Sequence, residues 1–153
     1  MQPRMNISAL LPDAYRALGA FDKAVRESGI DRKLLHLVKL RASQINGCAY
    51  CVDMHVKEAL AHGMDDQMLH LVAVWRESPF FDARMRAALE WTESLTLVAS
   101  TGVPDAAWDI VRAEFSETEI AQLTLVICAI NAWNRIAVSS RTLHPMPHQA
   151  AAQ

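Results

Sequence analysis

The chain has few of the features that mark multidomain, repetitive or nucleic-acid-binding proteins. Its 153 residues include only five glycines and six prolines, and no stretch rich in Gly, Ser or Pro divides the sequence into domains. No internal repeat is present. The formal charge of −2 gives no electrostatic reason to expect binding to nucleic acid or to an anionic membrane surface. We therefore expect one ordinary domain.

Signals for membrane insertion and secretion are also lacking. The longest apolar run, residues 123–130, is too short to span a bilayer and is interrupted by Thr124. The first residues show no basic patch followed by an apolar stretch, so no secretory signal is expected. The chain has three cysteines, an odd number that fits a reducing compartment better than a disulfide scaffold. We expect a cytoplasmic protein that does not enter a membrane.

What the chain does contain is helical, core-forming sequence. Hydrophobic residues make up 52% and charged residues 21%, so a packed core is expected rather than disorder. Nothing in the sequence favours a strand. Apolar periodicity, capping residues and breakers predict about seven helices: residues 12–28, 31–46, 48–63, 68–75, 82–101, a short one from 103, and 120–141. The prediction is one all-α domain over residues 1–143, followed by a disordered tail over residues 144–153.

Two of the predicted helices are apolar around much of their circumference. These are residues 48–63 and 120–141. A helix of this kind must be buried on most of its sides. In a chain of this length, we expect each to be a central helix, a subunit interface, or both. The pattern thus favours a homo-oligomer.

The strongest chemical signal is a Cys-x-x-Cys pair followed by a histidine. Cys48 and Cys51 come directly after Asn46-Gly47, and His55 follows four residues after Cys51. If Gly47 ends one helix and Cys48 begins the next, the three side chains share one helix face. The free N–H groups and dipole of a helix N-terminus favour a thiolate there. A histidine one turn away is placed to take and return a proton, as a redox dithiol requires.

Other interpretations of the pair were weighed against redox chemistry. Cysteines are often small buried hydrophobes, and Cys128, alone in an apolar run, fits that description. A structural zinc site needs four ligands, and no second Cys/His pair with suitable spacing follows. Only three further residues could complete such a site: His36, His62 and Cys128. Haem attachment requires a histidine directly after the second cysteine, where this chain has Val52.

A thioredoxin-like domain is also disfavoured. Its Cys-x-x-Cys would lie between a strand and a helix, whereas the residues before Cys48 have a helical pattern. The sequence therefore predicts a redox dithiol on an all-helical scaffold.

That combination, together with the sequence itself, resembles a known family. Residues 37–55, which carry the cysteine block, and residues 86–96 resemble the alkylhydroperoxidase D-like (AhpD-like) branch of the carboxymuconolactone decarboxylase superfamily. The resemblance implies an all-helical fold that assembles as a trimer or hexamer. It also implies reduction of organic hydroperoxides, or electron exchange with a thiol partner, through the two cysteines.

The resemblance assigns a role to each residue of the motif. Cys51 resembles the deeper cysteine that attacks the peroxide, and Cys48, nearer the solvent, resembles the resolving cysteine that closes the disulfide. His55 resembles the proton-relay base. An external dithiol or a lipoyl-type reductant protein would then reduce the disulfide. No bound cofactor and no metal are expected.

One position departs from the family pattern. Twelve residues before the first cysteine, where the family has a glutamate that supports the histidine, this chain has His36. A histidine at this position can bond to His55 but carries no fixed negative charge. A carboxylate from the second matching segment could assist, with Glu93 the first candidate and Glu90 the second.

Four functions were considered. The leading one is a thiol-dependent peroxidase of antioxidant defence. The alternative is a disulfide oxidoreductase or redox relay without strong peroxidase activity, which the histidine at position 36 favours. Ring decarboxylation, as in the superfamily's namesake, does not need the dithiol. A purely structural oligomer leaves the spacing of the cysteines and His55 unexplained.

Overall fold

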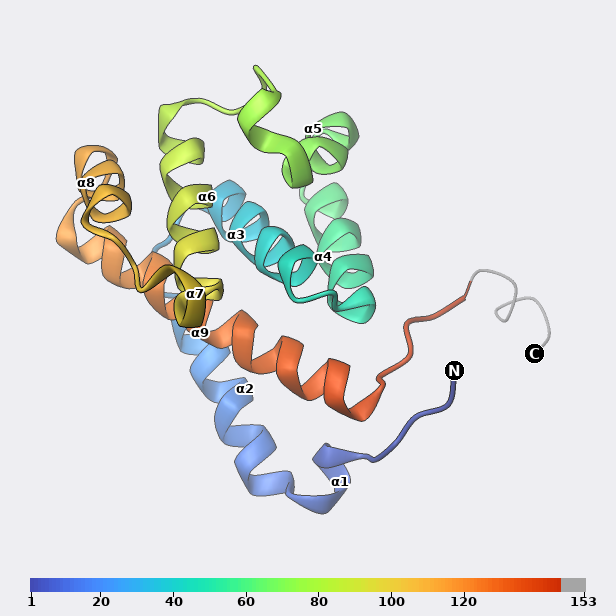
Figure 1. Ribbon diagram of the computed structural model, residues 1–153. Coiled ribbons are helices and arrows are strands. Elements are labelled where there is room, and N and C mark those ends of the chain that lie inside the picture. The colour runs from blue at the N-terminus through green and yellow to red at the C-terminus, as the bar shows by residue number, and fades with distance from the viewer. Residues whose placement is uncertain (147–153) are drawn as a thin grey trace.

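The computed structural model describes residues 1–146 and is built from helices (Figure 1). Over those residues it contains nine α-helices and one 3-10 helix, and no strand. The elements are α1 (Ile7–Leu10), α2 (Pro12–Arg26), α3 (Arg32–Ile45), α4 (Ala49–Ala61), α5 (Asp66–Leu71), η1 (Val72–Glu77), α6 (Ala83–Thr96), α7 (Val98–Thr101), α8 (Asp105–Glu114) and α9 (Glu117–Ser140). The predicted all-α class is confirmed. Residues 147–153, most of the predicted tail, lie outside the described residues.

The helices begin where the capping residues predict. The Asp31 carboxylate accepts a hydrogen bond from the Leu34 N–H (2.9 Å) at the start of α3. Asp65 does the same for α5. Ser116 and Glu119 form a reciprocal capping box at the start of α9. Each cap satisfies backbone donors that the first turn of a helix leaves free.

The count of about seven helices is low because two breaks and one short helix have weak sequence signals. α5 passes directly into η1, where Val74 has non-helical backbone angles. The predicted helix over 82–101 divides at Leu97 into α6 and α7. The four-residue α1, capped by Asn6, has too few residues for an apolar period to reveal it.

α3 is the central helix of the bundle. It packs against α4, α6 and α9, and nine of its 14 residues are buried. Its Leu34 and Val38 belong to a core cluster shared with α2, α6, α8 and α9. Its Leu37 and Leu40 belong to a second cluster shared with α4, α5, η1 and α6. Two faces of one helix thus join the two halves of the core.

The central position expected for residues 48–63 therefore belongs to α3. Within the protomer, α4 buries only Cys51, His55 and Ala59. α3 carries charged residues within its apolar pattern, so the sequence did not indicate that this helix is the most buried one. Lys39 is buried because its ammonium group binds Asp22 (2.8 Å), and such pairing is what allows a charge to leave water.

α9 is the other long apolar helix, and it lies across the bundle (Figure 1). Its 24 residues are long enough and apolar enough to cross a membrane by composition alone, so the length argument from residues 123–130 was incomplete. In the structure α9 buries eight residues. It packs against α2, α3, α4, α6 and α8. The core helix of a bundle meets the same composition test, and 44% of the apolar window of α9 is buried within the protomer. Leu125 and Val138 remain exposed on its outer side.

Candidate active site

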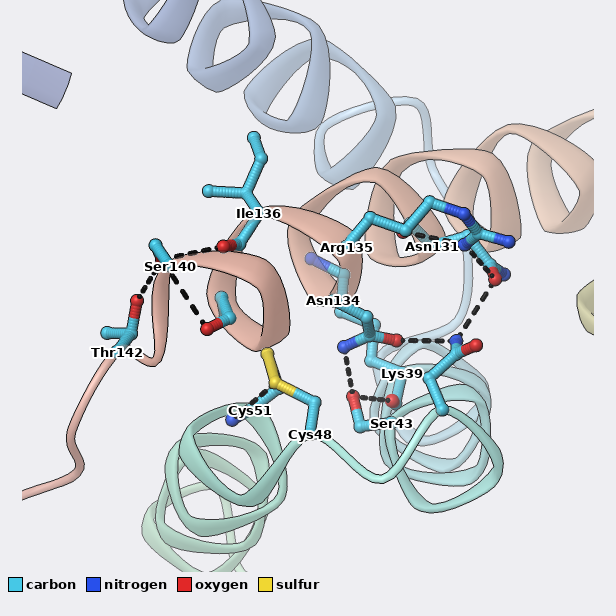
Figure 2. Close-up of a disulfide and its surroundings, with 12 residues drawn as sticks. Lys39, Ser43, Cys48, Cys51, Asn131, Asn134, Arg135, Ile136, Ser140 and Thr142 are labelled. Carbon is cyan, nitrogen blue, oxygen red and sulfur yellow. Dashed lines mark hydrogen bonds between the residues drawn. A yellow bond between two sulfur atoms is a disulfide. The ribbon is translucent and has the colours of Figure 1, made fainter. Parts of the chain in front are cut away.

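The dithiol lies at a tight turn between α3 and α4. Gly47 adopts a left-handed conformation (φ +64°), which costs a glycine little, and the Cys48 N–H then bonds to the Ser43 carbonyl (3.0 Å). Cys48 is the N-cap of α4, and its sulfur accepts a hydrogen bond from the Cys51 N–H (3.3 Å). Cys48 and Cys51 are joined as a disulfide, with their Cα atoms 5.4 Å apart (Figure 2).

Both cysteines are almost inaccessible from solvent, but only one lines a cavity. The exposed fraction is 1% for Cys48 and 2% for Cys51, so Cys48 is not the more exposed cysteine that the resemblance implied. Cys51 lines a cavity of about 310 Å³, and Cys48 is not among its lining residues. The cavity therefore lies against Cys51 and not against Cys48.

His55 is the polar group beside Cys51 in this cavity. It is buried and lines the cavity one helical turn after Cys51. Its Nδ1 lies 3.0 Å from a carboxylate oxygen of Glu58, and its Nε2 is buried without a hydrogen-bond partner. The hydrogen bond with His55 lowers the pKa of Glu58, against the opposing effect of burial. With the carboxylate ionised, Nδ1 is the protonated nitrogen, and Nε2 is left free to accept a proton.

Comparison with known sequences places the chain in a family. A sequence profile of the Carboxymuconolactone decarboxylase family matches residues 12–94, more than half of the chain. The chain belongs to this family. It is also 35% identical over 139 residues to the uncharacterized protein YdfG of Bacillus subtilis (strain 168), covering 91% of this chain and 95% of YdfG.

Solved structures place it in the AhpD-like branch. ATU0492 of Agrobacterium tumefaciens is a protein of unknown function for which the role of an antioxidant defence protein AhpD has been suggested. It is 48% identical, has a TM-score of 0.93, and is matched over 95% of this chain and 99% of its own. The debrominase Bmp8 is 18% identical with a TM-score of 0.81, matched over 91% of this chain and 75% of its own. At that identity Bmp8 shows the shared fold alone.

The residue at the glutamate position of the AhpD-like pattern, His36, is paired with another histidine. His36 lies on α3 and is 4% exposed, and its Nε2 is 2.7 Å from Nδ1 of His62. Burial, followed by the charge of His62, lowers the pKa of His36 to about 4. The structure thus pairs His36 with His62 and gives no hydrogen bond between His36 and His55.

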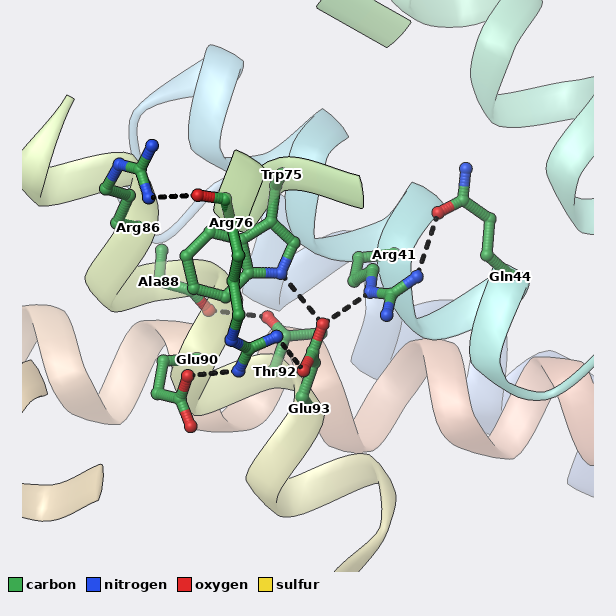
Figure 3. Close-up of polar contacts among 9 residues, drawn as sticks. All are labelled: Arg41, Gln44, Trp75, Arg76, Arg86, Ala88, Glu90, Thr92 and Glu93. Carbon is green, nitrogen blue, oxygen red and sulfur yellow. Dashed lines mark hydrogen bonds and ion pairs between the residues drawn. The ribbon is translucent and has the colours of Figure 1, made fainter. Parts of the chain in front are cut away.

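The structure does not bring Glu93 to the dithiol. Its carboxylate accepts hydrogen bonds from Arg41 Nε (2.7 Å), Trp75 Nε1 (2.8 Å) and Arg76 Nη1 (2.6 Å), a group that we call the Glu93 cluster (Figure 3). Glu90, the second candidate, also binds Arg76. The carboxylate that does bond to His55 is Glu58.

Glu58 was missed by the sequence analysis although a local signal was present. It lies three residues after His55, and residues three apart are neighbours on a helix. The other missed feature is the ion pair of Lys39 with Asp22, both of which line the cavity. These residues are 17 positions apart, on α2 and α3, so no local spacing predicts the pair.

A zinc site receives no support from the positions of its candidate ligands. Within residues 1–146, no group of three or more His, Cys, Asp or Glu side chains is arranged to hold a metal ion. His36 and His62 bond to one another, and Cys128 is exposed on α9.

Proposed function

We propose that the protein is a thiol-dependent peroxidase that reduces organic hydroperoxides. The observation that carries the proposal is the cavity, which is lined by both Cys51 and His55. Glu58 bonds to Nδ1 of His55, and Nε2 of the same ring has no hydrogen-bond partner. A nucleophile, a base and a group that orients the base form a recognised arrangement for activating a thiol.

The reaction begins from the reduced dithiol. His55 Nε2 takes the proton of the Cys51 thiol, and the resulting thiolate attacks the terminal oxygen of the hydroperoxide. The O–O bond breaks, and the departing alkoxide takes that proton back from His55. The product is an alcohol and a sulfenic acid on Cys51. The Cys48 thiol then attacks the Cys51 sulfur and releases water, which gives the disulfide. An external dithiol or a lipoyl-type protein supplies two electrons and two protons to restore the pair. We expect this cycle to run in the cytoplasm without a bound cofactor.

The test is consumption of tert-butyl hydroperoxide by the purified, metal-free protein with excess dithiothreitol. Cys51→Ser and Cys48→Ser should each abolish turnover, because each removes one sulfur of the cycle. Cys128→Ser is the matched control and should retain full turnover, since Cys128 is exposed on α9, outside the cavity. Turnover that survives in Cys51→Ser would overturn the proposal. Reversible disulfide formation without hydroperoxide consumption would indicate a redox relay instead.

We also propose that the chain assembles as a homotrimer or homohexamer. Large apolar side chains remain exposed on α8 and α9, namely Trp108, Ile110, Leu125 and Val138. These side chains are candidates for an interface between copies of the chain. A single monomeric mass in light scattering at micromolar concentration would contradict this.

A further inference from the structure

The cavity beside Cys51 is small, and much of its wall is apolar and aromatic. Its volume is about 310 Å³. Tyr15 from α2 and Trp133 from α9 both line it, and their rings meet edge to face with centroids 5.0 Å apart. Ile130 and Ile136 add branched apolar surface. Cavities that hold drug-sized ligands span roughly 300–1,000 Å³, so this one suits a ligand at the small end of that range.

The charged groups that line the cavity are paired with one another. Asp22 binds Lys39 (2.8 Å) through one carboxylate oxygen and Arg26 (3.1 Å) through the other. Glu58 binds His55. In formal charge, Lys39 and Arg26 balance Asp22 and Glu58, so these four lining residues carry no net charge. A ligand with an ionic head group would have to break an existing pair to bind, which costs free energy.

From the size, the aromatic wall and the cancelled charge, we infer that the substrate is a compact, uncharged hydroperoxide with an aromatic or branched hydrocarbon group, selected by Tyr15 and Trp133. This inference rests on the proposed function. The hydrocarbon group packs against the two rings, where aromatic partners gain from offset or edge-on contact. The hydroperoxide group then faces Cys51 and His55.

The experiment compares kcat/KM for four substrates: hydrogen peroxide, tert-butyl hydroperoxide, cumene hydroperoxide, and the anionic long-chain hydroperoxide of linoleic acid. We expect cumene hydroperoxide to exceed hydrogen peroxide at least about tenfold, because a filled apolar pocket gives discrimination of this order. Trp133→Leu should lower kcat/KM for cumene hydroperoxide and leave kcat/KM for hydrogen peroxide unchanged, so most of the preference should be lost. Trp108→Leu is the matched control, since this partly exposed tryptophan lies on α8 and does not line the cavity.

A binding measurement separates this inference from the proposed function. Cumyl alcohol, the uncharged product, should shift the Trp133 indole N–H signal in the NMR spectrum of the wild-type protein, whether or not turnover occurs. Binding of cumyl alcohol without hydroperoxide turnover would contradict the peroxidase proposal but support the inferred class of ligand. Equal kcat/KM for all four substrates, a preference for the linoleic acid hydroperoxide, or no cumyl alcohol binding would overturn the inference.

A second inference comes from Asn134, a polar residue on the apolar helix α9. Its side chain is fully buried, with an exposed fraction of 0%. Its Oδ1 accepts a hydrogen bond from Asn46 Nδ2 (2.9 Å), and its Nδ2 donates to Ser43 Oγ (3.1 Å) (Figure 2). Asn46 is the C-cap of α3, two residues before Cys48. The Asn134 side chain on α9 therefore holds the turn before Cys48 in place through two hydrogen bonds.

We also propose that Asn134 is a positioning residue that sets the reduction potential of the Cys48–Cys51 pair. A turn held in place keeps the two thiols close together even when they are reduced. The high effective concentration of one thiol beside the other then favours the disulfide. Asn46 donates to Asn131 Oδ1 as well (3.0 Å), which strengthens the anchor.

The test is redox equilibrium with dithiothreitol, which is independent of peroxidase activity. Asn134→Leu keeps the volume and should shift the equilibrium constant at least about tenfold toward the reduced pair, because the freed turn makes ring closure less favourable. Asn46→Ala removes the other partner of the Asn46–Asn134 hydrogen bond and should shift the equilibrium constant in the same direction. Thr92→Val is the control, since it removes a buried hydroxyl that bonds only within α6. A constant within about twofold of wild type in two folded variants would overturn the proposal.

Discussion

Glu58 and Glu93 are two glutamates with lowered pKa values in very different surroundings. Both oxygens of Glu93 are occupied, by Arg41, Trp75 and Arg76. Glu58 shares one hydrogen bond with His55, and the far nitrogen of that histidine has no partner. The Glu93 cluster is saturated and fixes three elements together. His55, one helical turn after Cys51, instead keeps one ring nitrogen without a partner, and an unsatisfied buried nitrogen of this kind is a candidate for proton transfer.

The pKa values of the two carboxylates are lowered by different groups. For Glu93, burial acts to raise the pKa, and hydrogen bonds from Trp75 and Arg76 with the charge of Arg41 outweigh it. For Glu58, the hydrogen bond with His55 is the main cause. One carboxylate is stabilised by permanent cations and the other by a residue that can exchange its proton. The following variants test that contrast.

The largest effect is expected from Glu58→Gln. Glutamine keeps a hydrogen-bonding group but loses the charge that orients His55 and stabilises its protonated form. Hydroperoxide turnover should fall about tenfold to a hundredfold, in the range of a general acid–base contribution. Steady-state kinetics measures this, and an unchanged rate would show that His55 works without Glu58.

Glu93→Gln should lower stability and leave turnover nearly unchanged, the reverse of what we expect for Glu58→Gln. The Glu93 substitution leaves Arg41 without its carboxylate and Arg76 with Glu90 alone, so we expect a loss of about 2 kcal/mol in the free energy of unfolding. Turnover of the folded protein should stay within about twofold of wild type. Urea denaturation with parallel activity assays makes the comparison. A large loss of turnover at full stability would contradict the structural role.

The smallest effect concerns His36 and pH. Its pKa is lowered from 6.5 to about 4, so the folded state resists a proton that the unfolded state accepts. The penalty from protonating His36 is therefore absent above about pH 6.5, and it lowers the free energy of unfolding as the pH drops toward 4. His36→Gln should flatten part of this fall in thermal unfolding midpoints. His70→Gln is the control, because His70 is exposed.

Local signals predicted the all-α class and most helix boundaries. Asp31, Asp65 and Ser116 cap α3, α5 and α9. These signals work because a cap involves residues at most three apart in the chain. The cysteine block identified the dithiol and its helix start for the same reason.

Long-range pairing is what the sequence did not show. α3 lies at the centre although it carries Lys39 and Arg41, because these two residues pair with Asp22 and Glu93. The partner of His36 is His62, which is 26 residues away in the chain. Glu58 is the exception, because its spacing from His55 was visible in the sequence.

The position of α2 affects how a substrate reaches the buried sulfur. This helix supplies Tyr15, Asp22 and Arg26 to the cavity, yet it buries only Val25. Elements with few buried contacts open by local unfolding far more often than the whole protein unfolds. We expect the backbone amides of α2 to exchange with deuterium much faster than those of α3. Brief local unfolding of α2 would then open the cavity to a molecule while α3, α6 and α9 stay folded.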